Sequence, residues 1–332
     1  MRVGVIGAGA VGGAIAALLE RDGHRVEVTA RGDHLAAIAE SGLRLTGAWG
    51  DHVAHVDVSE KLTRAAELVI VATKAQDAHA ALRDNLRMLR GIPLVVVQNG
   101  LDGITTASAA SPRSDVVGGL ATFASSFLSP GAVTVTAAGP LYLGVKAHDS
   151  DLPARYAQGV LAPVLPTELV SNFAGAQWTK LVINQVNALP AITGLSVQEV
   201  VADASLCRIM TASMRETVRV ALASHVHFEK VQGLDHRTLR LFALAPLWLG
   251  QALPRRMAAG MGAVPNPGST LQSIRRGQLT EVDYLNGAVV RAAKAIGLTA
   301  AVNLDLVDLV HDVERSGVFV TADAVSARVF GR

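Results

Sequence analysis

Short apolar runs and amphipathic segments alternate from Arg2 to about Gln98. The apolar runs have the length of strands, and they read RVGVI, HRVEVTA, ELVIVAT and PLVVVQ. The segments between them, such as AIAALLERDG, DHLAAIAESG and AQDAHAALRDNLRML, have the length and the apolar spacing of helices. Strands that alternate with helices are typical of βαβ units. The pattern therefore predicts an α/β fold with a parallel sheet.

Two stretches depart from that alternation. Residues 43–58, LRLTGAWGDHVAHVDV, alternate apolar and polar positions around a central glycine, which is typical of a β-hairpin. Residues 116–145 carry no charge and are long enough to span a bilayer, but glycine, proline and serine interrupt them repeatedly. We interpret this second stretch as β-hairpins in a buried sheet.

Long helical patterns follow Phe173, so we place a domain boundary there. The expected organisation is a parallel-sheet domain over residues 1–173 and an all-helical domain over residues 174–332. The segment 233–268 is the hardest to interpret, because it is rich in proline and contains an arginine pair. It could form a lid, an oligomer contact or an irregular pair of helices.

The composition agrees with two globular domains and limits the partners. At 332 residues the chain exceeds the usual size of about 150 residues per domain, and 50% of it is hydrophobic. The net charge of +2 is small and scattered, so neither nucleic acid nor a membrane surface is an expected partner, whereas a homodimer stays open. Cys207 alone cannot form an internal disulfide, and the N-terminus lacks the pattern of a secretory signal. We expect a cytoplasmic protein.

Gly7, Gly9 and Gly12 form a GxGxxG motif between the first strand and the first helix. Glycine allows the tight turn, lets a pyrophosphate approach the backbone, and lets the helix pack closely on the strand. The anion then lies against unpaired N–H groups at the helix N-terminus. The motif is weak evidence alone but strong in this position, and it predicts a Rossmann-type dinucleotide-binding domain.

The end of the second strand normally selects the dinucleotide. An acidic residue there binds the ribose 2′-hydroxyl of NAD, but this strand ends in Thr29 and Ala30 and is followed by Arg31, with Glu27 inside the strand. An arginine without an acidic neighbour at the strand tip suits the 2′-phosphate of NADPH. The alternative is that Arg31 is a solvated loop residue.

Lys74 and Asn99 follow two further strands. Ligands of open α/β sheets bind outside the carboxyl ends of the strands, so both residues are candidates for the cofactor site. Each could instead serve its turn, since Asn-Gly is a common turn dipeptide and Lys74 could simply open a helix.

The segment Trp178–Leu189, WTKLVINQVNAL, is predicted to be one helix with Lys180, Asn184 and Asn187 on a shared face. A solvated polar stripe is the ordinary explanation. Asparagine is costly inside a helix, however, which favours a function.

Glu281 projects on the apolar stripe of the helix predicted after it, and Thr280 with Asp283 would form its capping box. This carboxylate is either functional or a first-turn group that satisfies the helix dipole. Ser269 follows a proline-rich loop, where capping a helix over residues 271–276 is the ordinary role.

Metal and nucleophilic chemistry have little support. The histidine pairs His52 with His55 and His225 with His227 come without a convincing third ligand, so no metal site is expected. Cys207 has no candidate base nearby in the sequence.

Taken together, these motifs resemble the ketopantoate reductase (2-dehydropantoate 2-reductase) family over nearly the whole chain. The matching pieces are GAGAVG, ARGDHLAAIAESGLRL, ATKAQD, VVQNGLDG, the GG…PGAV…G…LG pattern of residues 118–144, WTKLVIN and STLQSIRRGQLTEVDYLNG. The resemblance implies reduction of the 2-oxo acid ketopantoate to pantoate with NADPH, a step of pantothenate biosynthesis.

The resemblance also implies roles for individual residues. Lys180 matches the general acid, Glu281 the group that binds the substrate hydroxyl region, and Ser269 the residue that holds the carboxylate end. Lys74 and Asn99 match residues that line the nicotinamide site, and Asn184 matches a substrate-binding asparagine. An ammonium beside the reacting carbonyl would both stabilise the developing negative charge and deliver a proton.

This chain departs from the family pattern at two positions. Ala188 stands where the family has its second helix asparagine, while Asn187, which we expect to bind the substrate with Asn184, lies one position earlier. Ser273 stands where an aspartate is common. The substrate could therefore be a different 2-oxo acid or related carbonyl. A non-catalytic NADPH-binding regulator is disfavoured, because it would not need Lys180 or Glu281.

Overall fold

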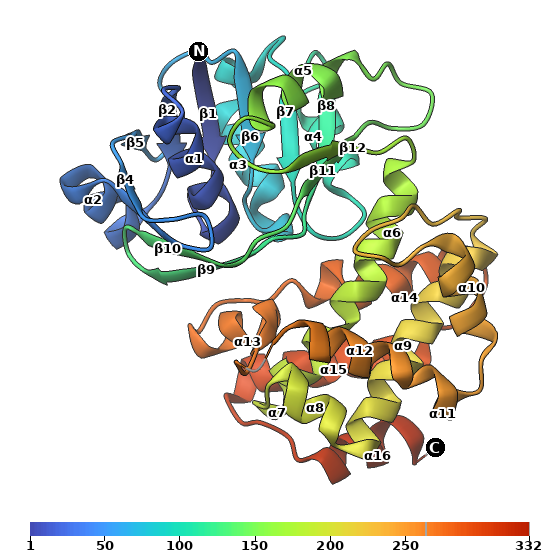
Figure 1. Ribbon diagram of the computed structural model, residues 1–332. Coiled ribbons are helices and arrows are strands. Elements are labelled where there is room, and N and C mark those ends of the chain that lie inside the picture. The colour runs from blue at the N-terminus through green and yellow to red at the C-terminus, as the bar shows by residue number, and fades with distance from the viewer. Residues whose placement is uncertain (263, 332) are drawn as a thin grey trace. The chain divides into compact units, whose positions relative to one another are not determined.

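The computed structural model describes residues 1–262 and 264–331 (Figure 1). The chain divides into two compact units, Met1–Ala174 and Gly175–Arg332. This division lies one residue beyond the boundary expected from the sequence.

The first unit is built on an eight-stranded sheet in the order β12-β11-β8-β7-β6-β1-β2-β5. The six strands from β8 to β5 run parallel, whereas β11 pairs with β8 in the antiparallel direction. The strands are β1 (Arg2–Ile6), β2 (Arg25–Thr29), β5 (Asp57–Ser59), β6 (Leu68–Val71), β7 (Leu94–Val97), β8 (Val116–Ala121), β11 (Leu141–Gly144) and β12 (Thr167–Leu169). The predicted α/β fold with a Rossmann-type parallel sheet is confirmed.

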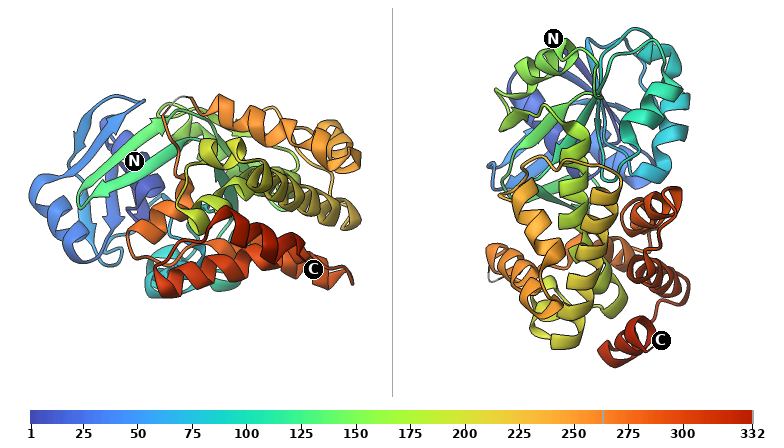
Figure 2. Two further views of the ribbon diagram at one scale, coloured as in Figure 1. Left: turned by 90° about the horizontal axis from the view of Figure 1, so that it is seen from below. Right: turned by 90° about the vertical axis from the view of Figure 1, so that its right-hand side faces the viewer.

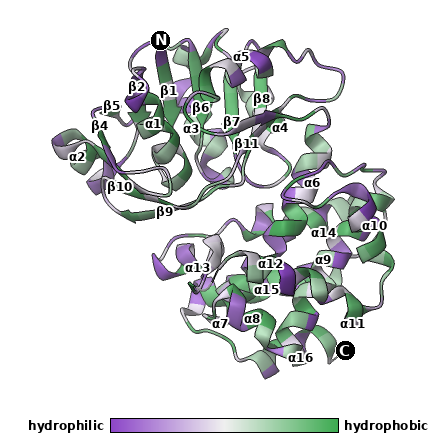
Figure 3. Cartoon of the chain, in the orientation of Figure 1, coloured by the Kyte–Doolittle hydropathy of each residue, from purple (hydrophilic) through white to green (hydrophobic). Residues whose placement is uncertain are grey.

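The strands of this sheet are buried on both faces. In β6, Leu68 and Ile70 belong to one hydrophobic cluster, while Val69 and Val71 belong to the other. Five helices accompany the sheet, and they are α1 (Ala10–Arg21), α2 (Gly32–Ser41), α3 (Ala75–Leu89), α4 (Gly103–Ala110) and α5 (Leu152–Leu161). Burial on both faces explains why the strands are continuous apolar runs (Figure 3).

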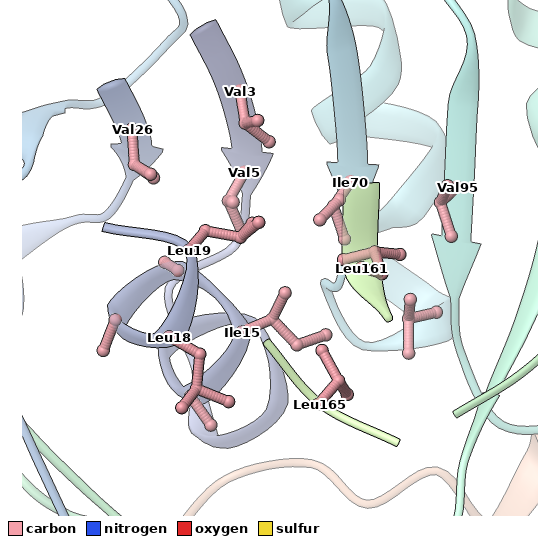
Figure 4. Packing of buried hydrophobic residues seen from close by; sticks show 14 of the residues in the cluster. Val3, Val5, Ile15, Leu18, Leu19, Val26, Ile70, Val95, Leu161 and Leu165 are labelled. Atoms are coloured by element: carbon pink, nitrogen blue, oxygen red, sulfur yellow. The ribbon is translucent and has the colours of Figure 1, made fainter. Parts of the chain in front are cut away.

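Helix α1 carries the glycine motif and is anchored by its apolar face. Ile15, Leu18 and Leu19 are at most 1% exposed and pack with Val3 and Val5 of β1 (Figure 4). Each such side chain stabilises the fold by about 1.5–3 kcal/mol relative to an exposed one. The position of the helix N-terminus is therefore determined by the core.

A second sheet, in the order β4-β3-β10-β9, accounts for the two stretches that break the alternation. Its strands are β3 (Leu43–Gly47), β4 (His52–Ala54), β9 (Ala124–Ser129) and β10 (Ala132–Ala137). The predicted hairpin at 43–58 is confirmed for β3 and β4, although β5 leaves it to pair with β2. The predicted hairpin within 116–145 is confirmed for β9 and β10, which pair in the antiparallel direction, but its expected burial is wrong, because these strands are half exposed. Their lack of charge reflects serine and threonine on the exposed face.

The second unit is helical, as expected, and the only bridge among its described residues joins Val231 to Leu234. The long helix α9 (Ala204–Ala223) lies at its centre and contacts α8, α10, α11, α12, α14, α15 and α16 (Figure 2). The other elements are α6 (Phe173–Asn184), η1 (Gln185–Asn187), α7 (Ala188–Thr193), α8 (Val197–Ala202), α10 (His236–Leu244), α11 (Leu247–Gly250), α12 (Ala252–Gly260), α13 (Gly268–Arg275), η2 (Val282–Tyr284), α14 (Asn286–Ala295), α15 (Ala301–Ser316) and α16 (Ala322–Phe330).

The segment 233–268 forms three short helices rather than a pair. These are α10 (His236–Leu244), α11 (Leu247–Gly250) and α12 (Ala252–Gly260), and they pack on α8 and α9. Ala263 lies outside the described residues. None of the helices over residues 1–262 and 264–331 is long and apolar enough to cross a membrane.

Candidate active site

The three glycines of the first turn contribute to its geometry in three different ways. Gly7 has φ of +99°, a backbone conformation that glycine adopts most easily. A methyl group on Gly12 would lie 2.0 Å from the carbonyl oxygen of Gly7, so α1 could not pack against the turn. A methyl group on Gly9, at the N-cap of α1, would meet no atom within 4 Å. The turn therefore leaves open space in front of the helix N-terminus, as a pyrophosphate requires.

Thr29 and His34 hold this turn in place. The amide of Gly7 donates to Thr29 Oγ1 at 2.9 Å, and the amide of Ala8 donates to the Thr29 carbonyl at 2.9 Å. His34 Nδ1 accepts from the amide of Gly131 at 2.9 Å, so its proton is on Nε2, which donates to the Ala8 carbonyl at 2.7 Å. His34 was not predicted from the sequence, although it lies in the ARGDHL motif, three residues after Arg31.

Arg31 and Glu27 take different roles at the end of β2. Arg31 follows the strand, is exposed and precedes the first residue of α2. Glu27 is 3% exposed, and its carboxylate accepts hydrogen bonds from the amide and the hydroxyl of Thr63, each at 2.7 Å. The carboxylate of Glu27 is thus hydrogen-bonded to the loop after β5. Arg31 is the charged group that β2 presents beyond its carboxyl end.

Lys74 and Asn99 are brought to the same edge of the sheet. They follow β6 and β7, which are adjacent and parallel, and both are partly buried. Lys74 is the N-cap residue of α3. Gln98 Nε2 donates to the Thr73 carbonyl at 2.9 Å, which ties the two strand ends together.

The predicted single helix over 178–189 is wrong in one respect, since the 3₁₀ turn η1 separates α6 from α7. Pro190 has no amide hydrogen and its ring would clash in an uninterrupted helix, but proline is tolerated in the first turn of α7. Asn187 Nδ2 donates to the Asn184 carbonyl at 3.1 Å, which satisfies a group at the break. The break changes the rotation of Asn187 about the helix axis relative to Lys180.

The polar residues of this segment do not form a solvated stripe. Asn184 is 7% exposed and Asn187 is 8% exposed. Lys180 is partly buried, and burial lowers the pKa of its ammonium group to about 8. Lys180 on α6 can therefore act as a proton donor near neutral pH.

Asn187 also fixes the start of α13. Its Oδ1 accepts from the amide of Ser269 at 3.3 Å, and a methyl group on Gly268 would lie 2.5 Å from the same oxygen. Helix α13 begins at Gly268, with Pro267 as the N-cap residue and no side-chain cap, so the expected capping role of Ser269 is wrong. Ser269 lies instead in the first turn, where it is exposed. A substrate contact by Asn187 stays a prediction.

Glu281 does not lie in the helix expected for it. Thr280 Oγ1 accepts from the amide of Val282 at 3.2 Å, and the 3₁₀ turn η2 follows, so the predicted capping box is not formed. Helix α14 begins only at Asn286. Glu281 is partly buried and precedes η2.

A buried amide network joins the 3₁₀ turn η1 to the start of α14. Asn286 Nδ2 donates to Gln185 Oε1 at 2.7 Å and to Asn303 Oδ1 at 3.0 Å. Asn303 Nδ2 donates to Glu216 Oε2 at 2.7 Å, and all three amide side chains are at most 1% exposed. The residue after Asn184 is thereby bonded to the first residue of α14. The sequence offered only the LNG motif as a signal for this network.

Metal binding and a reactive thiol are the other kinds of chemistry that the sequence raised. Residues 1–262 and 264–331 contain no group of three or more His, Cys, Asp or Glu side chains that could hold a metal ion. Cys207 is buried, and burial raises the pKa of its thiol, which disfavours the reactive thiolate.

Comparison with known proteins identifies the family. A family model for ketopantoate reductase PanE/ApbA matches residues 3–148, and the model for its C-terminal part matches residues 172–314. The 2-dehydropantoate 2-reductase of Pyrococcus abyssi is 26% identical over 95% of this chain and 98% of its own length.

Solved structures agree with these matches. The crystal structure of a PanE/ApbA family ketopantoate reductase from Ralstonia eutropha JMP134 has a TM-score of 0.81 at 29% identity, and the match covers 95% of this chain and 99% of that chain. D-mandelate dehydrogenase in complex with NADH and anilino(oxo)acetate has a TM-score of 0.82 at 20% identity over 95% and 99% of the chains, which shows the shared fold alone.

The glycine turn of the first unit and the family matches over both units define an NADP-dependent oxidoreductase. Within that class, the chain belongs to the ketopantoate reductase family. The resemblance seen in the sequence motifs is thereby confirmed.

The bridge that His34 forms between the Ala8 carbonyl and the Gly131 amide should support NADPH binding. His34→Ala should raise the Kd for NADPH about fivefold, because losing roughly 1 kcal/mol of hydrogen bonding to Ala8 and Gly131 loosens the glycine turn. Fluorescence titration with NADPH measures this, and His79→Ala, at an exposed position on α3, is the matched control. Equal affinities for the two variants would show that the bridge does not support the cofactor site.

Proposed function

We propose that this protein reduces ketopantoate to pantoate with NADPH and that Lys180 is the general acid. The observation that carries the proposal is the family match over both units, and the partly buried Lys180 ammonium on α6, whose pKa burial lowers to about 8, supports its role. A general acid works best when its pKa is close to the operating pH. At pH 7 this group is still mostly protonated and holds its proton less firmly than an exposed lysine.

The first unit supplies the residues that would hold NADPH. The open space at Gly9 fits a pyrophosphate, and Arg31 fits the 2′-phosphate because Glu27 is committed elsewhere. Lys74 and Asn99 would line the nicotinamide end. The bound cofactor supplies a hydride to C2 of the substrate.

The second unit supplies the residues that would hold the 2-oxo acid. Lys180 Nζ would face the carbonyl oxygen, stabilise the negative charge that develops there and transfer a proton to it. Glu281 would accept a hydrogen bond from the substrate hydroxyl. Ser269, which is exposed in the first turn of α13, would bind the carboxylate through its hydroxyl group. Asn184 is buried beside the break in the helix and would orient the substrate.

The proposal extends to location and assembly. We place the enzyme in the cytoplasm, where the free thiol of Cys207 stays reduced. Its partner is a small 2-oxo acid, and a homodimer is compatible with this reaction.

A second candidate is a reductase of another 2-oxo acid. It is favoured by the commitment of Asn187 to Asn184 and Ser269, and by Ser273, which is 6% exposed and bonds the Ser269 carbonyl at 3.4 Å. Steady-state consumption of NADPH with ketopantoate and a panel of 2-oxo acids separates the two candidates. A kcat/KM for ketopantoate well below that of another acid would select the second.

Lys180→Ala should lower kcat by a factor of about 10² to 10⁴, because the oxyanion loses its proton donor. The Kd for NADPH should stay within about twofold of the wild-type value, since only the acid is removed. Steady-state assays and NADPH titration measure the two quantities, with Lys294→Ala on the exposed part of α14 as the control. A near-normal kcat would remove Lys180 from the mechanism.

The pH dependence of kcat/KM should show a limb near pH 8. Burial lowers the pKa of Lys180 from the ordinary value of 10.5 to about 8, and only the protonated form donates. The rate should be constant below this pH and fall about tenfold per unit above it. Profiles between pH 6 and 10 test this, and a rate that stays constant up to pH 10 would contradict the effect of burial.

Arg31→Ala should raise the KM for NADPH by about tenfold or more and leave the KM for NADH unchanged, because a guanidinium pairs with the 2′-phosphate that only NADPH carries. The ratio of kcat/KM for the two nicotinamides is the measurement. Arg113→Ala, at an exposed position away from β2, is the control. An unaltered ratio would mean that other residues recognise the 2′-phosphate.

A further inference from the structure

Residues of α15 form hydrogen bonds to the turn that contains Glu281, on both sides of that residue. Glu314 Oε1 accepts from the amide of Thr280 at 2.7 Å. Three residues along the turn, Asp283 Oδ1 bonds His311 Nε2 at 3.1 Å. His311 Nδ1 in turn bonds Glu314 Oε2 at 2.7 Å. We call His311 and Glu314, with their contacts to Thr280 and Asp283, the α15 clamp.

The chemistry of the clamp requires a charged histidine. Ionised carboxylates only accept hydrogen bonds, so an imidazole between two of them must donate from both nitrogens. Burial opposes this charge, but the hydrogen bonds to Glu314 and Asp283 outweigh it and raise the pKa of His311. Burial likewise opposes the charge of Glu314, yet its bonds to Thr280 and His311 lower its pKa.

The clamp matters because the turn has little regular structure of its own. A 3₁₀ turn has poorer hydrogen-bond geometry than an α-helix, and η2 is only three residues long. Helix α14 starts at Asn286, too late to hold Glu281 directly. Arg291 Nη1 adds one bond to the Asp283 carbonyl at 2.7 Å. The amides of Tyr284 and Leu285 donate to the Glu281 carbonyl at 2.9 and 3.0 Å, and the bonds from α15 to Thr280 and Asp283 hold the turn on either side of Glu281.

We propose that His311 and Glu314 are positioning residues, which hold the Glu281 turn in the geometry that binds the 2-oxo acid. This inference rests on the proposed function for the role of Glu281. It extends the site to α15, whose residues do not themselves touch the substrate.

The test compares three variants at the clamp with one control on the same helix. His311→Ala and Glu314→Ala break the clamp. Glu314→Gln retains an oxygen for the Thr280 amide and a donor for a neutral His311, so it should rescue the turn. Asp312→Asn removes an exposed ion pair with Arg315 of the same sequence spacing and is the matched control.

The two Ala variants should raise the KM for the 2-oxo acid about tenfold, a loss of roughly 1.4 kcal/mol in binding, while the Kd for NADPH stays within about twofold. Glu314→Gln and Asp312→Asn should keep the KM within about threefold of the wild-type value. Lower thermal stability with an unchanged KM in both Ala variants would overturn the positioning role. His311 is 30% exposed, so its variant should fold even if Glu314→Ala does not.

Hydrogen exchange makes the result independent of turnover. The amides of Thr280 and Val282 should exchange faster in His311→Ala than in Asp312→Asn, because only the former loses the clamp. Unchanged exchange would overturn the clamp itself. If the wild-type enzyme reduced no 2-oxo acid, the proposed function would fall, and exchange would still decide whether α15 holds the turn.

Discussion

The second unit depends on the pair of hydrogen bonds that the Asn286 amide donates to Gln185 and Asn303. All three side chains are buried, and a buried polar group without a partner costs about 1–3 kcal/mol. The network is therefore satisfied only when η1, α14 and α15 meet in one arrangement. Because Gln185 follows Asn184 and Asn286 lies five residues after Glu281, that arrangement brings together the two segments with most of the proposed substrate groups.

Apart from Lys180, which lies within α6, the proposed substrate residues lie at helix ends or beside the 3₁₀ turns η1 and η2. Asn184 is the last residue of α6, Asn187 is in the 3₁₀ turn that follows, Ser269 is in the first turn of α13, and Glu281 precedes η2. Such ends leave backbone groups without helical partners. Here side chains from distant parts of the chain satisfy several of them, as Asn187 does for Ser269 and Glu314 for Thr280. The same bonds that complete the helix ends thus fix the candidate site.

The glycine turn of the first unit depends mainly on residues that are close together in the sequence. The conformation of Gly7, the close contact at Gly12 and the open space at Gly9 arise within residues 7–12 and the strands beside them. Even here the turn needs distant support, since His34 connects the Ala8 carbonyl to the hairpin residue Gly131. Sequence motifs identify the turn well and its supporting bridge poorly.

The sequence by itself determined the parallel sheet, the helical second unit and the glycine turn, because these follow from short-range periodicity and backbone sterics. It also pointed to Lys180 and Glu281 through the family resemblance. Only the tertiary structure decided that the helix breaks at Gln185, that Glu281 lies outside its helix, and that Glu27 is committed to a loop. It alone revealed the partners His34, Asn286 and His311. A hydrogen bond between residues tens of positions apart leaves no periodic trace in either segment, so no local pattern could predict it.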